Sequence, residues 1–233
     1  MNHTRFPVVL RTLALLALLA LAAGPAAAGP PLICHPFDIG DAKSLPWVSH
    51  DWNLTGQEGY DTRSLAADTL AILDSSDVTL VHMETLRRAT LYARKDPASG
   101  KQLLVRLVSR AEAGRSSGHP NALAIFDAGY LAEAYQQWLG EGGQNPAHGL
   151  DGRVQINKAL GLRTSDAQME FAAALAGLKG PAEENQEHVR KAVAGAKSDP
   201  LLARNLATRF LGSQSPTMAE MIARDSSTKV AKQ

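Results

Sequence analysis

The sequence of 233 residues contains one cysteine, Cys34, few aromatic residues and little net charge. A single cysteine excludes an intramolecular disulfide framework and any metal centre built from four thiolates. A formal net charge of +1 gives no electrostatic reason to expect binding to nucleic acid or to an anionic membrane. Isoleucine and valine, which favour strands, are much rarer than alanine and leucine, which favour helices. The composition therefore points to a helical protein without internal disulfides.

The first 28 residues have the pattern of a secretory signal peptide. A basic start containing Arg5 and Arg11 precedes the apolar run Thr12–Ala23, and small residues follow it, so that cleavage is expected after Ala28. The apolar run has about 12 residues, fewer than the roughly 20 needed to span a bilayer. We therefore expect export to the periplasm or the extracellular space, with no stable membrane span after cleavage.

Apolar residues recur at helical spacing along most of the remaining chain. The stripe formed by Leu123, Phe126, Tyr130 and Ala134 is one example. The pattern predicts an all-α fold built from antiparallel helical hairpins, with helices near 63–74, 78–95, 100–113, 121–139, 150–161, 165–179, 182–197 and 199–211.

The chain divides by composition into three parts after the signal peptide. Residues 29–64 lack helical periodicity but hold several aromatic residues and prolines, which predicts an irregular N-terminal arm laid against the first helices. Residues 65–212 form the expected helical domain, with the glycine-rich segment 140–152 as a hinge between its halves. Residues 213–233 read as a polar and partly disordered tail.

Start signals mark the last three helices, and for the helix near 182 the signal is Pro181 after Gly180. Ser165 lies three residues before Gln168, which is the spacing of a capping box. Asp199 precedes Pro200, a capping acid followed by a first-turn proline. These helices are therefore expected to begin near 165, 182 and 199. A helix pair would then repeat about every 34 residues, the period of tetratricopeptide arrays.

When Pro200 is aligned with the proline that ends the repeat, the chain resembles the tetratricopeptide family over roughly Met169–Pro200. Leu175 and Ala176 stand where the family has its Leu-Gly/Ala pair, whereas Lys179 and His188 replace the usual tyrosine and the usual packing alanine. The resemblance implies an α-solenoid whose concave face binds a protein or peptide. An irregular helical bundle would account for the same helices and stays open as the alternative.

The N-terminal arm holds the densest group of residue types that bind metals. They are Cys34, His35, Asp38, His50 and Asp51. A thiolate, two imidazoles and a carboxylate can form a tetrahedral zinc site, or a site of three ligands and a water. Their spacing matches no zinc signature. Cys34 can equally be a small buried apolar side chain, or a thiol that forms an intermolecular disulfide.

Two further patterns place histidine beside another reactive group. Cys34 followed by His35 is similar to the end of a haem-attachment motif, but Pro31 stands where that motif has its second cysteine. Glu184 and His188 lie one helical turn apart, a spacing that suits metal binding or proton sharing, and equally a solvated surface pair.

The sequence predicts an exported helical protein that acts as an interaction or scaffold module rather than as an enzyme. Its expected partner is a protein or peptide, not nucleic acid, and no cofactor is expected. Trp47 and Trp52 are the candidate contact residues of the arm. The alternatives are a metal- or thiol-dependent enzyme that uses the Cys34–Asp51 cluster, and a haem or metal carrier.

Overall fold

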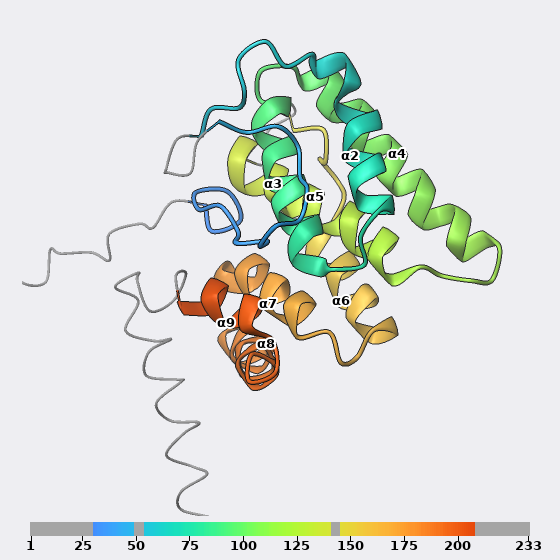
Figure 1. Cartoon of the computed structure of the whole chain (residues 1–233). Helices are drawn as coiled ribbons and strands as arrows, with labels where there is room; N and C mark the ends of the chain where they lie inside the picture. The colour runs from blue at the N-terminus through green and yellow to red at the C-terminus, as the bar shows by residue number, and fades with distance from the viewer. Residues whose placement is uncertain (1–29, 49–53, 141–144, 208–233) are drawn as a thin grey trace, which may run out of the picture.

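The computed structural model describes residues 30–48, 54–140 and 145–207 (Figure 1). Within these ranges the chain is helical and has no strand, which confirms the predicted all-α fold class. The signal peptide and the polar tail lie outside the described residues. The α-helices are α2 (Leu65–Asp74), α3 (Thr79–Ala93), α4 (Pro97–Ser116), α5 (Ala122–Leu139), α6 (Gly152–Leu162), α7 (Ala167–Ala176), α8 (Ala182–Gly195) and α9 (Pro200–Leu206).

Most helix starts are fixed by a short polar side chain. At five of them the carboxylate or amide oxygen of the capping residue accepts a hydrogen bond from the backbone N–H three residues later; the caps are Asp96, Asn121, Asp151, Asp166 and Asp199. The predicted start at Asp199 and Pro200 is therefore confirmed. The predicted capping box at Ser165 is wrong by one residue, because Asp166 caps α7 and the side chain of Gln168 instead accepts from the Leu80 N–H.

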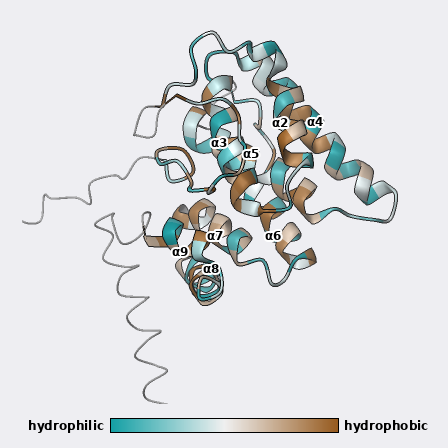
Figure 2. Cartoon of the chain, in the orientation of Figure 1, coloured by the Kyte–Doolittle hydropathy of each residue, from teal (hydrophilic) through white to brown (hydrophobic). Residues whose placement is uncertain are grey.

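Helix α3 is the centre of the molecule. Every residue of α3 except Arg88 is buried, and the helix contacts α2, α4, α5 and α7. Apolar residues gather where α3, α5, α6 and α7 meet (Figure 2). An isolated helix of this length would be marginal in water, so its stability comes from burial on all sides.

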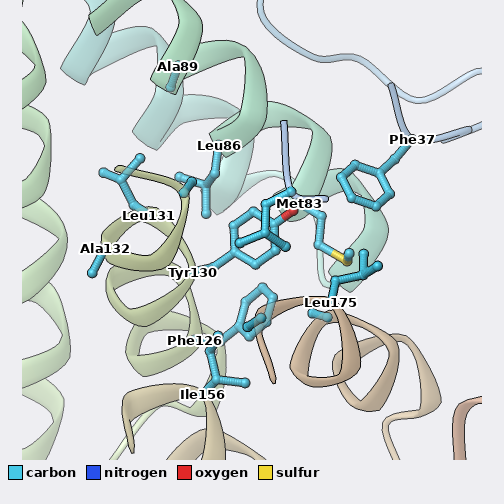
Figure 3. Packing of buried hydrophobic residues seen from close by; sticks show 14 of the residues in the cluster. Phe37, Met83, Leu86, Ala89, Phe126, Tyr130, Leu131, Ala132, Ile156 and Leu175 are labelled. Atoms are coloured by element: carbon cyan, nitrogen blue, oxygen red, sulfur yellow. The ribbon is translucent and has the colours of Figure 1, made fainter. Parts of the chain in front are cut away.

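One continuous apolar core joins the arm to the helices. Figure 3 shows the side chains that meet there, contributed by the arm, α3, α5, α6 and α7: Phe37, Met83, Leu86, Phe126, Tyr130, Leu131, Ile156 and Leu175. The ring of Phe37 also packs edge-on against Phe171 of α7, with 6.1 Å between the ring centroids. The arm is therefore part of the core and not an appendage to it.

Contacts between segments that are distant in sequence indicate a bundle. Helix α7 packs against α8 as a helical hairpin, but it also contacts α3 and α5. At the two ends of the described chain, Asp38 of the arm bonds to Arg204 and Asn205 of α9. In a solenoid each repeat touches only its neighbours. The described residues instead pack around α3.

None of the helices in the described part of the chain combines the length and the apolar character that crossing a bilayer requires. The predicted hinge at 140–152 includes residues 141–144, which lie outside the described ranges. Just after them, Asn145 is buried and its amide donates to Gln136 Oε1 and to the Gly140 carbonyl, at 3.0 and 2.8 Å. This side chain ties the end of the segment to α5.

Candidate functional site

A buried carboxylate of α3, Glu84, organises a network of hydrogen bonds that links the arm to this helix. The two oxygens of Glu84 accept from Arg87 at 2.8 and 3.0 Å, from Arg88 at 2.7 Å and from the Phe37 N–H at 2.8 Å. Arg87 also donates to the Ile33 carbonyl at 3.0 Å, and Arg88 to the Leu45 carbonyl at 2.6 Å. Glu84 and Arg87 are almost completely buried. This network fixes the path of the arm.

Three of the five predicted metal-ligating residues are among the residues that the structure describes. Cys34 and His35 are half-buried near the turn that begins at Pro30. Asp38 is exposed, and its carboxylate accepts from Arg204 at 2.6 Å and from the Gly40 N–H at 2.9 Å. The Arg204 hydrogen bond is the main reason that the pKa of Asp38 lies below its usual value. His50 and Asp51 lie outside the described residues.

The zinc hypothesis therefore stays a prediction. Among residues 30–48, 54–140 and 145–207, no group of three or more His, Cys, Asp or Glu side chains is arranged to hold a metal ion. Two of the five proposed ligands are not among those residues, so the full set has not been placed.

The Trp47 side chain is half-buried and packs against α3. Its ring lies edge-on to Tyr92, with centroids 5.8 Å apart, and the guanidinium carbons of Arg87 and Arg88 lie 5.4 and 6.0 Å from the Trp47 centroid. The Tyr92 hydroxyl donates to the Pro46 carbonyl. These contacts give Trp47 a packing role, and its predicted role in binding stays untested. Trp52 lies outside the described residues.

A small pocket lies between α6, α7 and α8. Its volume of about 20 Å³ has room for one or two water molecules. Apolar side chains form part of its wall, and charged and amide side chains form the remainder. The lining residues are Arg153, Ile156, Asn157, Ala173, Ala176, Gly177, Pro181, Glu184, Asn185 and His188.

His188 is held in the pocket wall by a carboxylate of another helix. Its Nδ1 lies 2.5 Å from Oε2 of Glu170, a buried residue of α7. The other oxygen of Glu170 lies 3.1 Å from Lys191 Nζ. Burial alone would raise the pKa of Glu170, but the hydrogen bonds and charges of His188 and Lys191 lower it below its usual value. A charged Glu170 orients the imidazole, with Nε2 facing Glu184 at 3.9 Å.

Two amide side chains complete the polar part of the pocket. Asn157 of α6 donates to Oε1 of Glu184 at 2.9 Å, and Asn185 of α8 donates to the Ala174 carbonyl at 3.2 Å. The pocket thus presents a carboxylate, an imidazole, two amides and the guanidinium of Arg153 within a small space. Such a set can donate and accept hydrogen bonds to one small polar group.

The sequence pattern identified only the local part of this site. Glu184 and His188 were expected together because they lie one helical turn apart. Glu170 comes from the preceding helix, and Asn157 from the helix before that. No local spacing relates these positions, so their convergence depends on how the three helices pack.

Comparison of the chain with models of protein families, with curated proteins and with solved structures finds no match. Its function is therefore inferred from the geometry of the described residues.

Proposed function

We propose that this chain is an exported helical interaction module that binds a protein or peptide partner, with the pocket between α6, α7 and α8 as part of the contact surface. The observation that supports this proposal is the pocket itself, where an apolar wall meets several converging polar side chains. Binding sites in proteins characteristically combine these two features.

The chemistry of the pocket suits a group from a polypeptide. A peptide bond offers one N–H donor and one carbonyl acceptor. Asn157, Asn185 and Arg153 provide donors, and Glu184 provides an acceptor, beside the apolar surface of Ile156. The volume of about 20 Å³ limits what enters the pocket to one small group. The remainder of a partner would lie across the neighbouring helix surfaces.

The location of the pocket agrees with the resemblance noted in the sequence. Helices α7 and α8 form the hairpin within the segment Met169–Pro200, which resembles a tetratricopeptide repeat, and both helices line the pocket. A helical hairpin that presents side chains to a partner is the usual working unit of such repeats. The family assignment itself remains part of the proposal.

Replacing both Asn157 and Glu184 with alanine is expected to weaken partner binding at least tenfold without unfolding the protein. Both side chains are exposed, so their loss removes polar contacts but leaves the core intact. The measurement is affinity capture from the native envelope fraction, followed by titration of the captured protein. Glu187→Ala is the matched control, because Glu187 is on α8 but does not line the pocket. Equal binding by the double variant and the control would contradict the proposed site.

Three simple measurements test the remaining parts of the proposal. Mass spectrometry of the exported protein should give an N-terminus at Gly29, as cleavage after Ala28 requires. Elemental analysis and an absorption spectrum of the purified protein should show neither stoichiometric zinc nor a Soret band. Either signal would favour the metal-site or carrier alternatives built on Cys34 and its neighbours.

A further inference from the structure

His82 and Asp127 form a buried pair in the centre of the bundle. His82 belongs to α3 and Asp127 to α5, and both side chains are completely buried. The distance between His82 Nδ1 and Asp127 Oδ1 is 2.6 Å. The second ring nitrogen, Nε2, lies 2.9 Å from the carbonyl oxygen of Ser76, in the connection between α2 and α3. Both ring nitrogens therefore face oxygen atoms.

This arrangement requires one more proton than neutral histidine and a carboxylate provide. A neutral imidazole has a single N–H, so it can donate to only one of the two oxygens. Both hydrogen bonds form if His82 is an imidazolium beside the Asp127 carboxylate. They also form if a protonated Asp127 donates to Nδ1 while Nε2–H donates to Ser76. In either form the pair is neutral overall and holds the same proton.

A charged side chain of a third helix lies on the Asp127 side of the pair. Arg110 of α4 has its NH1 3.6 Å from Asp127 Oδ2, while its NH2 pairs with Asp74 of α2 at 2.5 Å. On the α7 side, Asp166 accepts from the Thr79 hydroxyl and pairs with Arg163. Burial alone would lower the pKa of His82, but the hydrogen bond and charge of Asp127 raise it above its usual value. Burial likewise raises the pKa of Asp127.

We propose that the His82–Asp127 pair, while it holds its proton, binds the connection between α2 and α3 to helix α3. When the pair loses its proton, the remaining imidazole N–H stays with the Asp127 carboxylate, which bears the full charge. The Ser76 carbonyl then loses its donor and faces a ring nitrogen lone pair in a buried site. An unsatisfied buried acceptor is strongly unfavourable. Deprotonation therefore releases the segment 75–78 from α3.

The direction of the pH effect follows from proton counting. In the unfolded chain, His82 releases its proton near pH 6.5 and Asp127 near pH 3.9. The folded pair keeps one proton across this range. Between about pH 6.5 and the pH at which the folded pair loses its own proton, the folded state holds one more proton than the unfolded state, so the unfolding equilibrium constant rises tenfold per pH unit. Below about pH 4 the unfolded state holds one more proton than the folded state, so stability falls as the pH decreases. The pair contributes most between these limits.

The test is urea unfolding of the full chain between pH 5 and pH 10, comparing wild type with His82→Gln. The variant should lack the loss of stability that the pair contributes from about pH 6.5 upward until the folded pair is deprotonated. His188→Gln serves as the control, because His188 also pairs with a carboxylate, and it should retain that loss. Equal pH slopes in wild type and His82→Gln would overturn the proposal.

A second measurement needs no variant. Nitrogen-15 chemical shifts of the His82 ring in the intact protein report whether Nε2 carries a proton. We expect an Nε2–H at pH 6, and faster amide exchange of residues 75–78, corrected for the intrinsic pH effect, once that proton is lost. An Nε2 without a proton at pH 6 would overturn the proposal, as would amide protection at 75–78 that is unchanged when the proton leaves.

Discussion

Glu84→Gln is expected to lower the free energy of unfolding by about 3–5 kcal/mol, the effect typical of removing one partner of a buried ion pair. Glutamine has nearly the shape of glutamate, so the change removes the charge and leaves the volume. The Arg87 guanidinium would then be buried without a counter-ion, since Glu84 is its ion-pair partner. The amide nitrogen of glutamine would also face donors, namely Arg88 and the Phe37 N–H.

The measurement is urea unfolding at constant pH, combined with limited proteolysis of the N-terminal arm. Because the Glu84 network is one of the attachments of the arm to α3, cleavage within residues 30–48 should become faster than cleavage within the helices. Glu112→Gln is the matched control. Glu112 pairs with Arg115 one turn away on the surface of α4, and loss of such an exposed pair changes stability by less than about 1 kcal/mol. Similar losses in the two variants would show that the buried network does not stabilise the arm.

The helices were predictable because their signals are local. Alanine and leucine at helical spacing predicted each of the eight helices seen among the described residues, and the differences lie at the ends. The start expected at residue 100 lies at Pro97, because Asp96 caps α4 just before a first-turn proline. That signal has the same form as the one at Asp199. Helix α7 begins at Ala167 because Asp166 caps it, and not Ser165. Both side chains are able to cap a helix, so the sequence did not decide between them.

The polar interior was not predictable from local patterns. Glu84, Arg87 and Arg88 lie at spacings typical of a solvated helix face, yet α3 is buried on every side and the arm covers these residues. His82 and Asp127 are 45 positions apart, and only the packing of α3 on α5 brings them together. The pocket likewise depends on three helices. These sites form through contacts between helices that are distant in sequence. The periodicity of a single sequence does not reveal such contacts.

Gly129→Ala is expected to destabilise the protein by about 3 kcal/mol, although alanine is the better helix former. Helix propensity alone favours alanine over glycine by about 1 kcal/mol. At Gly129, however, an added Cβ would lie 2.8 Å from the Gly152 carbonyl oxygen and 3.0 Å from the Ile156 nitrogen. These are backbone atoms of α6, which cannot rotate away as a side chain does. The helices must separate, and overpacking of this kind typically costs about 1–3 kcal/mol, occasionally more.

Gly161→Ala in α6 is the matched control with the opposite expected sign. Apart from its chain neighbours and the backbone of its own helix, no atom lies within 4 Å of an added Cβ at Gly161, and its backbone is helical. The substitution should therefore raise stability by about 0.4–1 kcal/mol, the usual gain where a glycine already has a conformation that alanine can adopt. Both variants are compared with wild type by urea unfolding. A stabilising effect at Gly129 would mean that α5 and α6 are not in backbone contact, since propensity alone would then decide both substitutions.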